Sequence, residues 1–283
     1  MEMIKLWEQN TPYYDETIGQ PEPYLEAYRA QNAQEGAPFV IICPGGAYEN
    51  LSMDHEGRDV AKMFNLHGIH AAVLIYRLAP YHYPVMPLDI LRAVKVARHL
   101  AGDWGADPGK IGVMGFSAGG NLALLALTQY GNADCAQAQP DEIGALCGRP
   151  DFGILCYGVL SLEDGVTHDV TRAVLIGERD EAALIEKMTC EKAVTEDCPP
   201  VFLWHSADDR CVPVENSLRM AAALSAHNVP FEAHIFPHSP HGIGMGNPDQ
   251  RDERHAGQWT ELCLHWMKTY IMGEDESGRT EQC

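Results

Sequence analysis

The chain has 283 residues, 46% of them hydrophobic, and a formal net charge of −20 at pH 7. This length fits one large α/β domain better than two small ones, and no segment approaches the roughly 18 apolar residues of a membrane span. The negative charge disfavours nucleic acid, anionic membrane surfaces and polyanionic substrates as partners, because each would be repelled.

The first residues lack the basic region and apolar stretch of a signal peptide. The nine cysteines are scattered singly, without CxxC pairs or the Cys/His spacing of a metal site. Cys43 and Cys156 fall in apolar runs, which is typical of small core residues. These features predict a cytoplasmic protein.

Three segments of different composition follow one another along the chain. Residues 1–37 are rich in Pro, Tyr and Glu and weakly periodic, which predicts either an antiparallel edge hairpin or a partner-binding arm. Their aromatic side chains could also support subunit contacts in a homo-oligomer. Residues 38–272 form the main domain, and residues 273–283 are a polar tail that we expect to be frayed.

Within the main domain, short apolar runs alternate with helical patterns. The predicted strands are residues 39–43, 71–76, 111–114, 152–157, 201–204 and 231–236. The predicted helices are residues 54–66, 88–100, 121–130, 214–227 and 253–270. This alternation predicts an α/β fold, a mostly parallel central sheet with helices on both faces and no large lid domain.

The pentapeptide GFSAG around Ser117 joins the strand at 111–114 to the helix at 121–130. A strand–turn–helix of this kind presents a serine hydroxyl as a nucleophile at the carboxyl end of a parallel sheet. Side chains at Gly115 or Gly119 would crowd the turn. The helix directs its positive end at the place where an oxyanion would develop. Because GxSxG also arises by chance, its context rather than the motif itself makes the prediction.

A serine needs a base to take its proton and a carboxylate to orient that base. In a sheet of this kind the acid and then the histidine follow the serine along the chain. Asp208 and Asp209 share the turn after the strand at 201–204, where either could also be a turn former or helix cap. His241 follows the last predicted strand and precedes a glycine, and we favour it as the base over His238.

The loop that begins at Pro44 follows the strand at 39–43 and contains two consecutive glycines. A tetrahedral intermediate needs preorganised donors, and a loop without bulky side chains lets backbone N–H groups turn inward. The N–H of Gly46 or Ala47, together with that of Ala118, would form an oxyanion hole. An ordinary glycine turn would explain this loop taken alone. Three loops at one edge of the sheet, each with fitting chemistry, favour the catalytic interpretation.

The chain resembles the α/β-hydrolase superfamily, specifically the bacterial carbohydrate-esterase-like branch that includes acetylxylan and acetyl-sugar esterases. The matching segments are CPGGAY from Cys43, YRLAP from Tyr76, GFSAGGN from Gly115, the run from Trp204 to Ser217, and PHG from Pro240. They span roughly residues 38–245. One departure is Pro44, which stands where hormone-sensitive-lipase-like relatives carry a histidine and sets this chain apart from lipid esterases.

The resemblance implies the α/β-hydrolase fold for residues 38–272. It implies Ser117 as nucleophile, His241 as base and Asp209, four residues before the proline of a Val-Pro pair, as the acid. The oxyanion donors that it implies are Gly46, Ala47 and Ala118.

We therefore expect a serine carboxylesterase that removes short acyl groups, acetyl above all, from sugars or xylo-oligosaccharides through a covalent acyl-enzyme. Its partner would be a small acylated carbohydrate, and no metal or organic cofactor would be required. The same triad cleaves amides, so an arylformamidase or a small serine peptidase is an alternative. A catalytically inactive hydrolase-fold binding protein is another, although the complete set of Ser117, Asp209 and His241 argues against it.

Overall fold

The computed structural model describes residues 1–136, 140–178 and 182–273. The tail predicted at 273–283 lies outside these residues except for Gly273. The strands are β1 (Glu2–Lys5), β2 (Tyr24–Tyr28), β3 (Ala37–Cys43), β4 (His70–Ile75), β5 (Ala106–Phe116), β6 (Phe152–Cys156), β7 (Val201–Ser206) and β8 (Phe231–Phe236).

The α-helices are α1 (Asp59–Leu66), α2 (Val85–Trp104), α3 (Ala118–Thr128), α4 (Ala133–Ala136), α5 (Asp169–Ile176), α6 (Ala182–Met188), α7 (Glu215–Ala226), α8 (Arg251–Ala256) and α9 (Trp259–Trp266). A π-helical turn, Asp54–Arg58, leads into α1, and another, Met267–Met272, continues α9. Short 3-10 turns cover Glu16–Ile18, Ile143–Ala145 and Cys190–Ala193.

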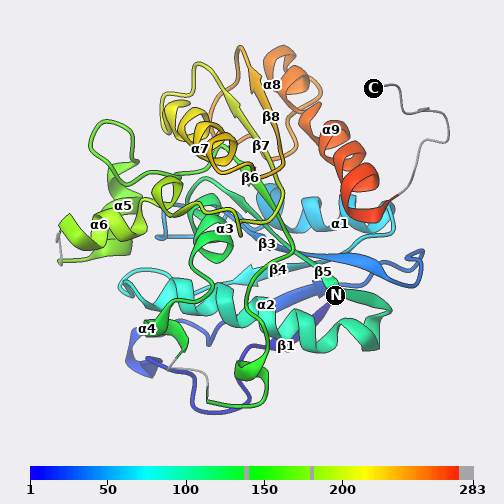
Figure 1. Ribbon diagram of the computed structural model, residues 1–283, viewed down its shortest axis with the longest axis vertical. Coiled ribbons are helices and arrows are strands. Elements are labelled where there is room, and N and C mark those ends of the chain that lie inside the picture. Colours follow the sequence, from blue (N-terminus) through cyan, green and yellow to red (C-terminus); the bar gives the residue numbers. More distant parts are fainter. Residues whose placement is uncertain (137–139, 179–181, 274–283) are drawn as a thin grey trace.

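One eight-stranded sheet in the order β1-β2-β4-β3-β5-β6-β7-β8 runs through the protein (Figure 1). Strands β3 to β8 pair in parallel, whereas β2 is antiparallel to both β1 and β4. The prediction of a mostly parallel sheet is confirmed. Because parallel strands end at the same edge, the loops after β3, β5, β7 and β8 meet there.

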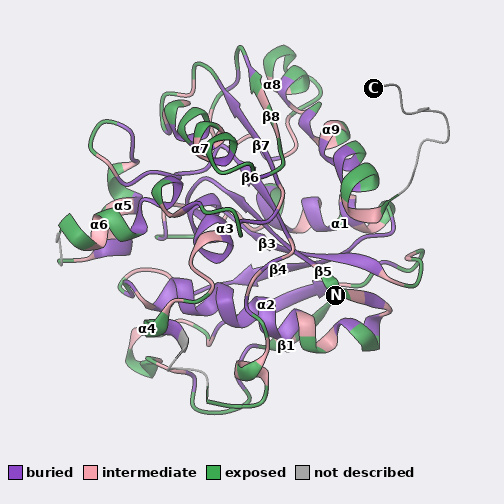
Figure 2. Cartoon of the chain, viewed as in Figure 1, coloured by how far each residue is buried: buried purple, intermediate pink, exposed green. Residues whose placement is uncertain are grey.

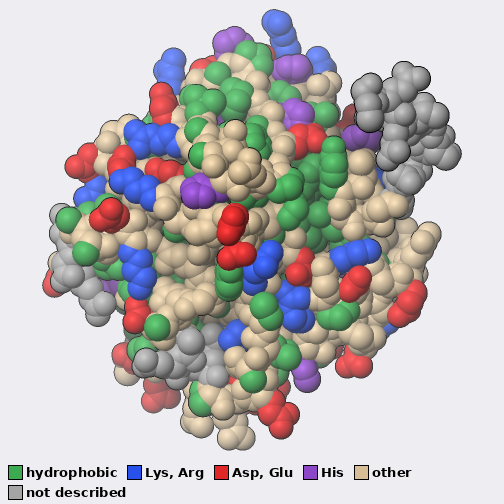
Figure 3. Space-filling view, viewed as in Figure 1, with side chains coloured by type: hydrophobic (Ala, Val, Ile, Leu, Met, Phe, Trp, Pro, Cys, Tyr) green, Lys and Arg blue, Asp and Glu red, His purple; other side chains and the backbone are tan. Residues whose placement is uncertain are grey.

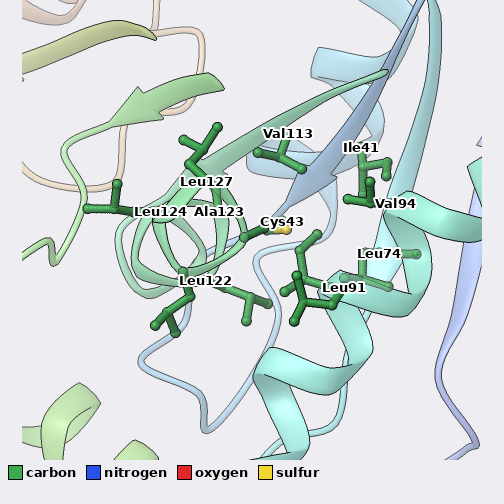
Figure 4. Close-up of a cluster of buried hydrophobic side chains, with 14 of the residues drawn as sticks. Ile41, Cys43, Leu74, Leu91, Val94, Val113, Leu122, Ala123, Leu124 and Leu127 are labelled. Atoms are coloured by element: carbon green, nitrogen blue, oxygen red, sulfur yellow. The ribbon is translucent and has the colours of Figure 1, made fainter. Parts of the chain in front are cut away.

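Helices cover both faces of the sheet and enclose two apolar cores (Figure 2). Side chains of β3 alternate between the cores, so Ile41 faces α2 and α3 whereas Ile42 faces α1 and α9. Figure 4 shows the first core, where Leu91 and Val94 of α2 and several leucines of α3 gather against the sheet. This double cover explains why the central strands are apolar throughout rather than alternating with polar residues.

The amino-terminal segment adds β1 and β2 to one edge of the sheet, and residues 6–23 between them pack against the domain. Two buried arginines hold this connection: Arg77 donates to the Pro12 carbonyl and Arg92 to the Leu6 carbonyl. The ring of Trp7 lies within 6 Å of both guanidinium groups, at 5.9 and 5.4 Å. In the structure, residues 1–37 are therefore built into the sheet edge.

The prediction of one continuous helix at 253–270 is wrong, because the structure has two helices there, α8 and α9, with a break at Gly257. A Cβ at Gly257 would come within 2.5 Å of the Met245 carbonyl oxygen, so the loop before α8 closes tightly on the break. The division places Trp259 beneath that loop, where its Nε1–H donates to the Gly244 carbonyl at 2.9 Å.

On the face drawn in Figure 3, acidic and basic side chains are interspersed. Across the ranges that the structure covers, no helix is long and apolar enough to span a membrane. No group of three His, Cys, Asp or Glu side chains in those ranges is placed to hold a metal ion. The described thiols outside any disulfide include those of Cys43, Cys147, Cys156, Cys190, Cys198, Cys211 and Cys263.

Candidate active site

Ser117 is the single residue between the end of β5 and the start of α3. Its φ of 50° lies in the left-handed region, which non-glycine residues rarely adopt and which stores strain. A Cβ at Gly115 would lie 1.9 Å from the Gly119 carbonyl oxygen, and one at Gly119 would lie 2.0 Å from that of Cys43. Both positions must be glycine, because backbone packs directly on backbone around the serine.

The structure brings Ser117, His241 and Asp209 into one hydrogen-bonded chain. Ser117 Oγ lies 2.9 Å from His241 Nε2, and His241 Nδ1 lies 2.7 Å from Asp209 Oδ2. A neutral imidazole with its proton on Nδ1 accounts for both contacts, since Nε2 then accepts from the hydroxyl. The side chain of Asp209 is 1% exposed and that of His241 is 17% exposed, so the chain of contacts leads from the interior to the surface.

The alternative candidates form a second pair outside this chain. His238 Nδ1 lies 3.0 Å from Asp208 Oδ2, and both side chains are at least half exposed. Asp208 also accepts from the Ser239 N–H, so it holds the loop that leads to His241. Among the described residues, Asp209 and His241 are the aspartate and histidine of this set that are hydrogen-bonded into the chain containing Ser117.

A second histidine, His205 on β7, approaches Asp209 from inside the protein. It is fully buried, with Nε2 at 3.4 Å from Asp209 Oδ2 and 2.9 Å from the Val212 carbonyl oxygen. Its Nδ1 lies 2.8 Å from Ser217 Oγ, which can donate to it. These contacts fix a proton on Nε2 and direct it toward the carbonyl and the carboxylate.

The environment of Asp209 stabilises its ionised form. Burial by itself would raise the pKa of this carboxyl, but hydrogen bonds from His205 and His241 outweigh burial and hold the pKa well below its usual range. The N–H of Val212 donates to Oδ1 at 3.0 Å and acts in the same direction. Asp209 is therefore a carboxylate wherever the protein is folded near neutral pH, as the orienting role requires.

The backbone N–H groups of the predicted oxyanion donors, Gly46, Ala47 and Ala118, have no acceptor in the described part of the chain. Gly46 and Ala47 have φ values of 128° and 56°, so the loop turns sharply after β3. Ala118 is the first residue of α3, where N–H groups have no helical partner. These free donors suit a negatively charged oxygen beside the serine.

A cavity of about 730 Å³ opens beside His241. Its other lining residues are His168, Asp208, Arg210, Cys211, His238, Ser239, Pro240 and Asp252. Burial and the neighbouring His241 lower the pKa of His168, which favours its neutral form. The lining carries charges of both signs and several hydrogen-bonding groups, so it suits a polar molecule better than a long hydrocarbon chain.

Sequence reasoning missed His205, Tyr157 and Glu56, which all contact the site. Tyr157 directly follows β6, and its ring lies 4.9 Å from that of His241. The strand-end argument that found Ser117 would also have found Tyr157. His205 directly follows the predicted strand at 201–204, so the same argument would have found it too. Glu56 lies within a helical turn and carries no such signal in the sequence.

Comparisons with known proteins bear on the family and the fold of the chain. The family model described as BD-FAE matches residues 25–224. An endo-1,4-beta-xylanase B of Butyrivibrio fibrisolvens is 31% identical over 86% of the chain, and an acetylxylan esterase of Xylanibacter ruminicola is 31% identical over 73%. The chain spans only 38% and 41% of the length of these two curated relatives.

A solved structure of an acetyl ester-xyloside bifunctional hydrolase from Caldicellulosiruptor lactoaceticus is similar over nearly the whole chain. It is 38% identical, covers 95% of this chain and 96% of its own, and superimposes with a TM-score of 0.85. This likeness identifies the fold as that of the α/β hydrolases, as the sequence predicted.

The lowered pKa of Asp209 makes a prediction about stability. Its ordinary pKa is 3.8, so the carboxylate stabilises the folded state above about pH 4 and this contribution is lost as the pH falls further. We expect Asp209→Asn to lower the free energy of unfolding by about 2 kcal/mol at pH 7. Urea unfolding should give a constant difference from the wild type down to about pH 5 and a decline below about pH 4. A difference that grew toward acid pH would contradict the ionised state.

Proposed function

The chain belongs to the BD-FAE family, with the α/β-hydrolase fold, and from this premise we propose that it is a serine carboxylesterase that removes acetyl groups from sugars or xylo-oligosaccharides. The observation that carries the proposal is the hydrogen-bonded chain from Ser117 through His241 to Asp209, at 2.9 and 2.7 Å. The unpaired N–H groups beside Ser117 support it further.

In the acylation step, Ser117 Oγ attacks the acetyl carbonyl carbon while His241 Nε2 takes the hydroxyl proton. The carbonyl oxygen becomes an oxyanion and accepts hydrogen bonds from the N–H of Ala118 and of Gly46 or Ala47. The bond from the carbonyl carbon to the sugar oxygen then breaks, and His241 gives its proton to that oxygen. The product is a free sugar hydroxyl and acetylated Ser117.

Deacylation follows the same route with water as the nucleophile. His241 takes a proton from water, which attacks the acetyl-serine carbonyl, and then returns a proton to Ser117 Oγ as acetate leaves. Asp209 stays ionised throughout and stabilises the imidazolium that forms in each half of the reaction. His205 keeps the Asp209 carboxylate in place from the buried side.

The preference for an acetylated sugar rests on the cleft and on the relatives. Polar lining residues such as His168, Arg210 and Asp252 can hydrogen-bond sugar hydroxyls. The net charge of −20 disfavours polyanionic substrates. The acetylxylan esterase and the acetyl ester-xyloside hydrolase among the similar proteins act on substrates of this class by their descriptions.

Replacing the nucleophile tests the mechanism. We expect Ser117→Ala to lower kcat/KM for p-nitrophenyl acetate by about 10⁴-fold or more, because no other group can form the acyl-enzyme. Circular dichroism should show that the variant remains folded, because alanine keeps the Cβ of serine and leaves the backbone of the turn unchanged. Activity within tenfold of the wild type would refute Ser117 as the nucleophile.

A substrate panel tests the chemical class. It should contain acetylated xylose and xylobiose, p-nitrophenyl esters of increasing chain length, N-formylkynurenine and a peptide p-nitroanilide. We expect the acetylated sugars and the shortest ester to give the highest kcat/KM. Faster cleavage of N-formylkynurenine or of the anilide would instead support an amide hydrolase on the same triad.

The two histidines of the cleft provide a matched pair of variants. His241→Ala should lower kcat on p-nitrophenyl acetate by about 10⁴-fold, because it removes the base. His238→Ala should stay within about threefold of the wild type, because His238 contacts Asp208 and not Ser117. The reverse order of effects would assign the base to His238.

A further inference from the structure

The mechanism leaves one buried carboxylate near the site unused. Glu56, in the π-helical turn before α1, is 2% exposed. Among the residues that the structure describes, no lysine, arginine or histidine forms an ion pair with Glu56. An unpaired buried carboxylate is costly to desolvate, so its place in the fold requires hydrogen bonds to its charged form.

Both oxygens of Glu56 accept a hydrogen bond, one from the loop after β3 and one from the residue that follows β6. Oε2 accepts from the N–H of Gly45 at 2.9 Å. Oε1 accepts from the hydroxyl of Tyr157 at 2.7 Å. Gly45 precedes the two candidate oxyanion donors, and Tyr157 follows β6, so the carboxylate joins segments that are far apart in the sequence.

In the loop after β3, Gly45 lies between the Glu56 carboxylate and the nucleophile Ser117. A Cβ at Gly45 would lie 2.7 Å from Glu56 Oε2 and 2.9 Å from Ser117 Cβ. Because the N–H of Gly45 is committed to Glu56, the orientation of this peptide is fixed. The free N–H groups of Gly46 and Ala47 come next along the same backbone, so their direction depends on that orientation.

After β6, Tyr157 contacts both Glu56 and the loop that contains His241 and Gly244. Its hydroxyl accepts from the N–H of Gly244 at 3.0 Å, and its ring packs edge-on at 4.9 Å from the ring of His241. Burial and the charge of Glu56 raise the pKa of Tyr157 well above its usual range, so the phenol keeps its proton and donates it to the carboxylate.

We propose that Glu56 is a positioning residue. It fixes the loop that contains Gly45, Gly46 and Ala47 relative to the loop that contains His241 and Gly244. A carboxylate serves here because both partners donate, and an amide in its place would offer one acceptor and two donors. Glu56 touches no reacting atom and acts through Gly45 and Tyr157. The proposal rests on the proposed serine-esterase function.

The test compares Glu56→Gln with Glu191→Gln, a matched control. Glu191 is also a buried carboxylate, at 9% exposed, and its ion pair is with Arg219, at 3.9 Å. On p-nitrophenyl acetate, Glu56→Gln should lower kcat about 10- to 100-fold with KM changed less than threefold, because the oxyanion donors are misplaced. Glu191→Gln should keep kcat within about twofold once corrected for the folded fraction.

The second measurement is the rate at which a fluorophosphonate probe labels Ser117, since this reaction needs the serine, the histidine and the oxyanion donors but no sugar. Labelling of Glu56→Gln should slow about as much as kcat. A wild type that labels rapidly but hydrolyses no acetylated sugar would contradict the proposed substrate alone. A folded Glu56→Gln that labels and turns over like the wild type would overturn the positioning role.

Tyr157→Phe removes the hydroxyl contacts to Glu56 and Gly244 but keeps the ring against His241, so it tests the Tyr157 side of the network apart from the Gly45 side. It should lower kcat about tenfold, and it carries the test if Glu56→Gln fails to fold. The double variant Glu56→Gln/Tyr157→Phe should lose less than the product of the two single effects, because both act through one network. Fully multiplicative losses, or a raised KM at unchanged kcat, would refute the network.

Discussion

The contact on which the rest of the site depends is the close approach of three backbone segments at the carboxyl edge of the sheet. The first turn of α3 lies so near the end of β3 that a single Cβ at Gly119 would overlap the Cys43 carbonyl. This approach places the loop after β3 beside Ser117. The same packing forces Ser117 into a left-handed conformation, and the surrounding sheet holds it there.

Two aspartates and two histidines show how the environment of a side chain decides its role. Asp208 and Asp209 are neighbours in one turn, and His238 and His241 lie three residues apart in one loop. The Asp208–His238 pair is exposed, where water competes for both charges. The Asp209–His241 pair is largely enclosed, with His205 behind the carboxylate, so its hydrogen bonds are fixed in direction.

Buried carboxylates hold the site together in two different ways. Asp209 is stabilised by imidazole and backbone donors and orients the proposed base. Glu56 is stabilised by a backbone N–H and a phenol and connects loops that the sheet alone leaves independent. In both cases the donors that offset the loss of hydration are the groups whose positions matter for the chemistry. Stability and preorganisation therefore depend on the same contacts.

The sequence by itself determined the α/β class, the strand–turn–helix around Ser117, and the loops that meet beside it, because these follow from local periodicity and from the common edge of parallel strands. It could not choose between Asp208 and Asp209 without a family resemblance, since both occupy one turn. It missed the break at Gly257, which depends on a distant loop packing against the helix. Only the tertiary structure revealed His205 behind Asp209 and the link from Glu56 to Tyr157, 101 positions away along the chain. Such contacts join residues whose separation in sequence carries no periodic signal, so they exist only once the chain is folded.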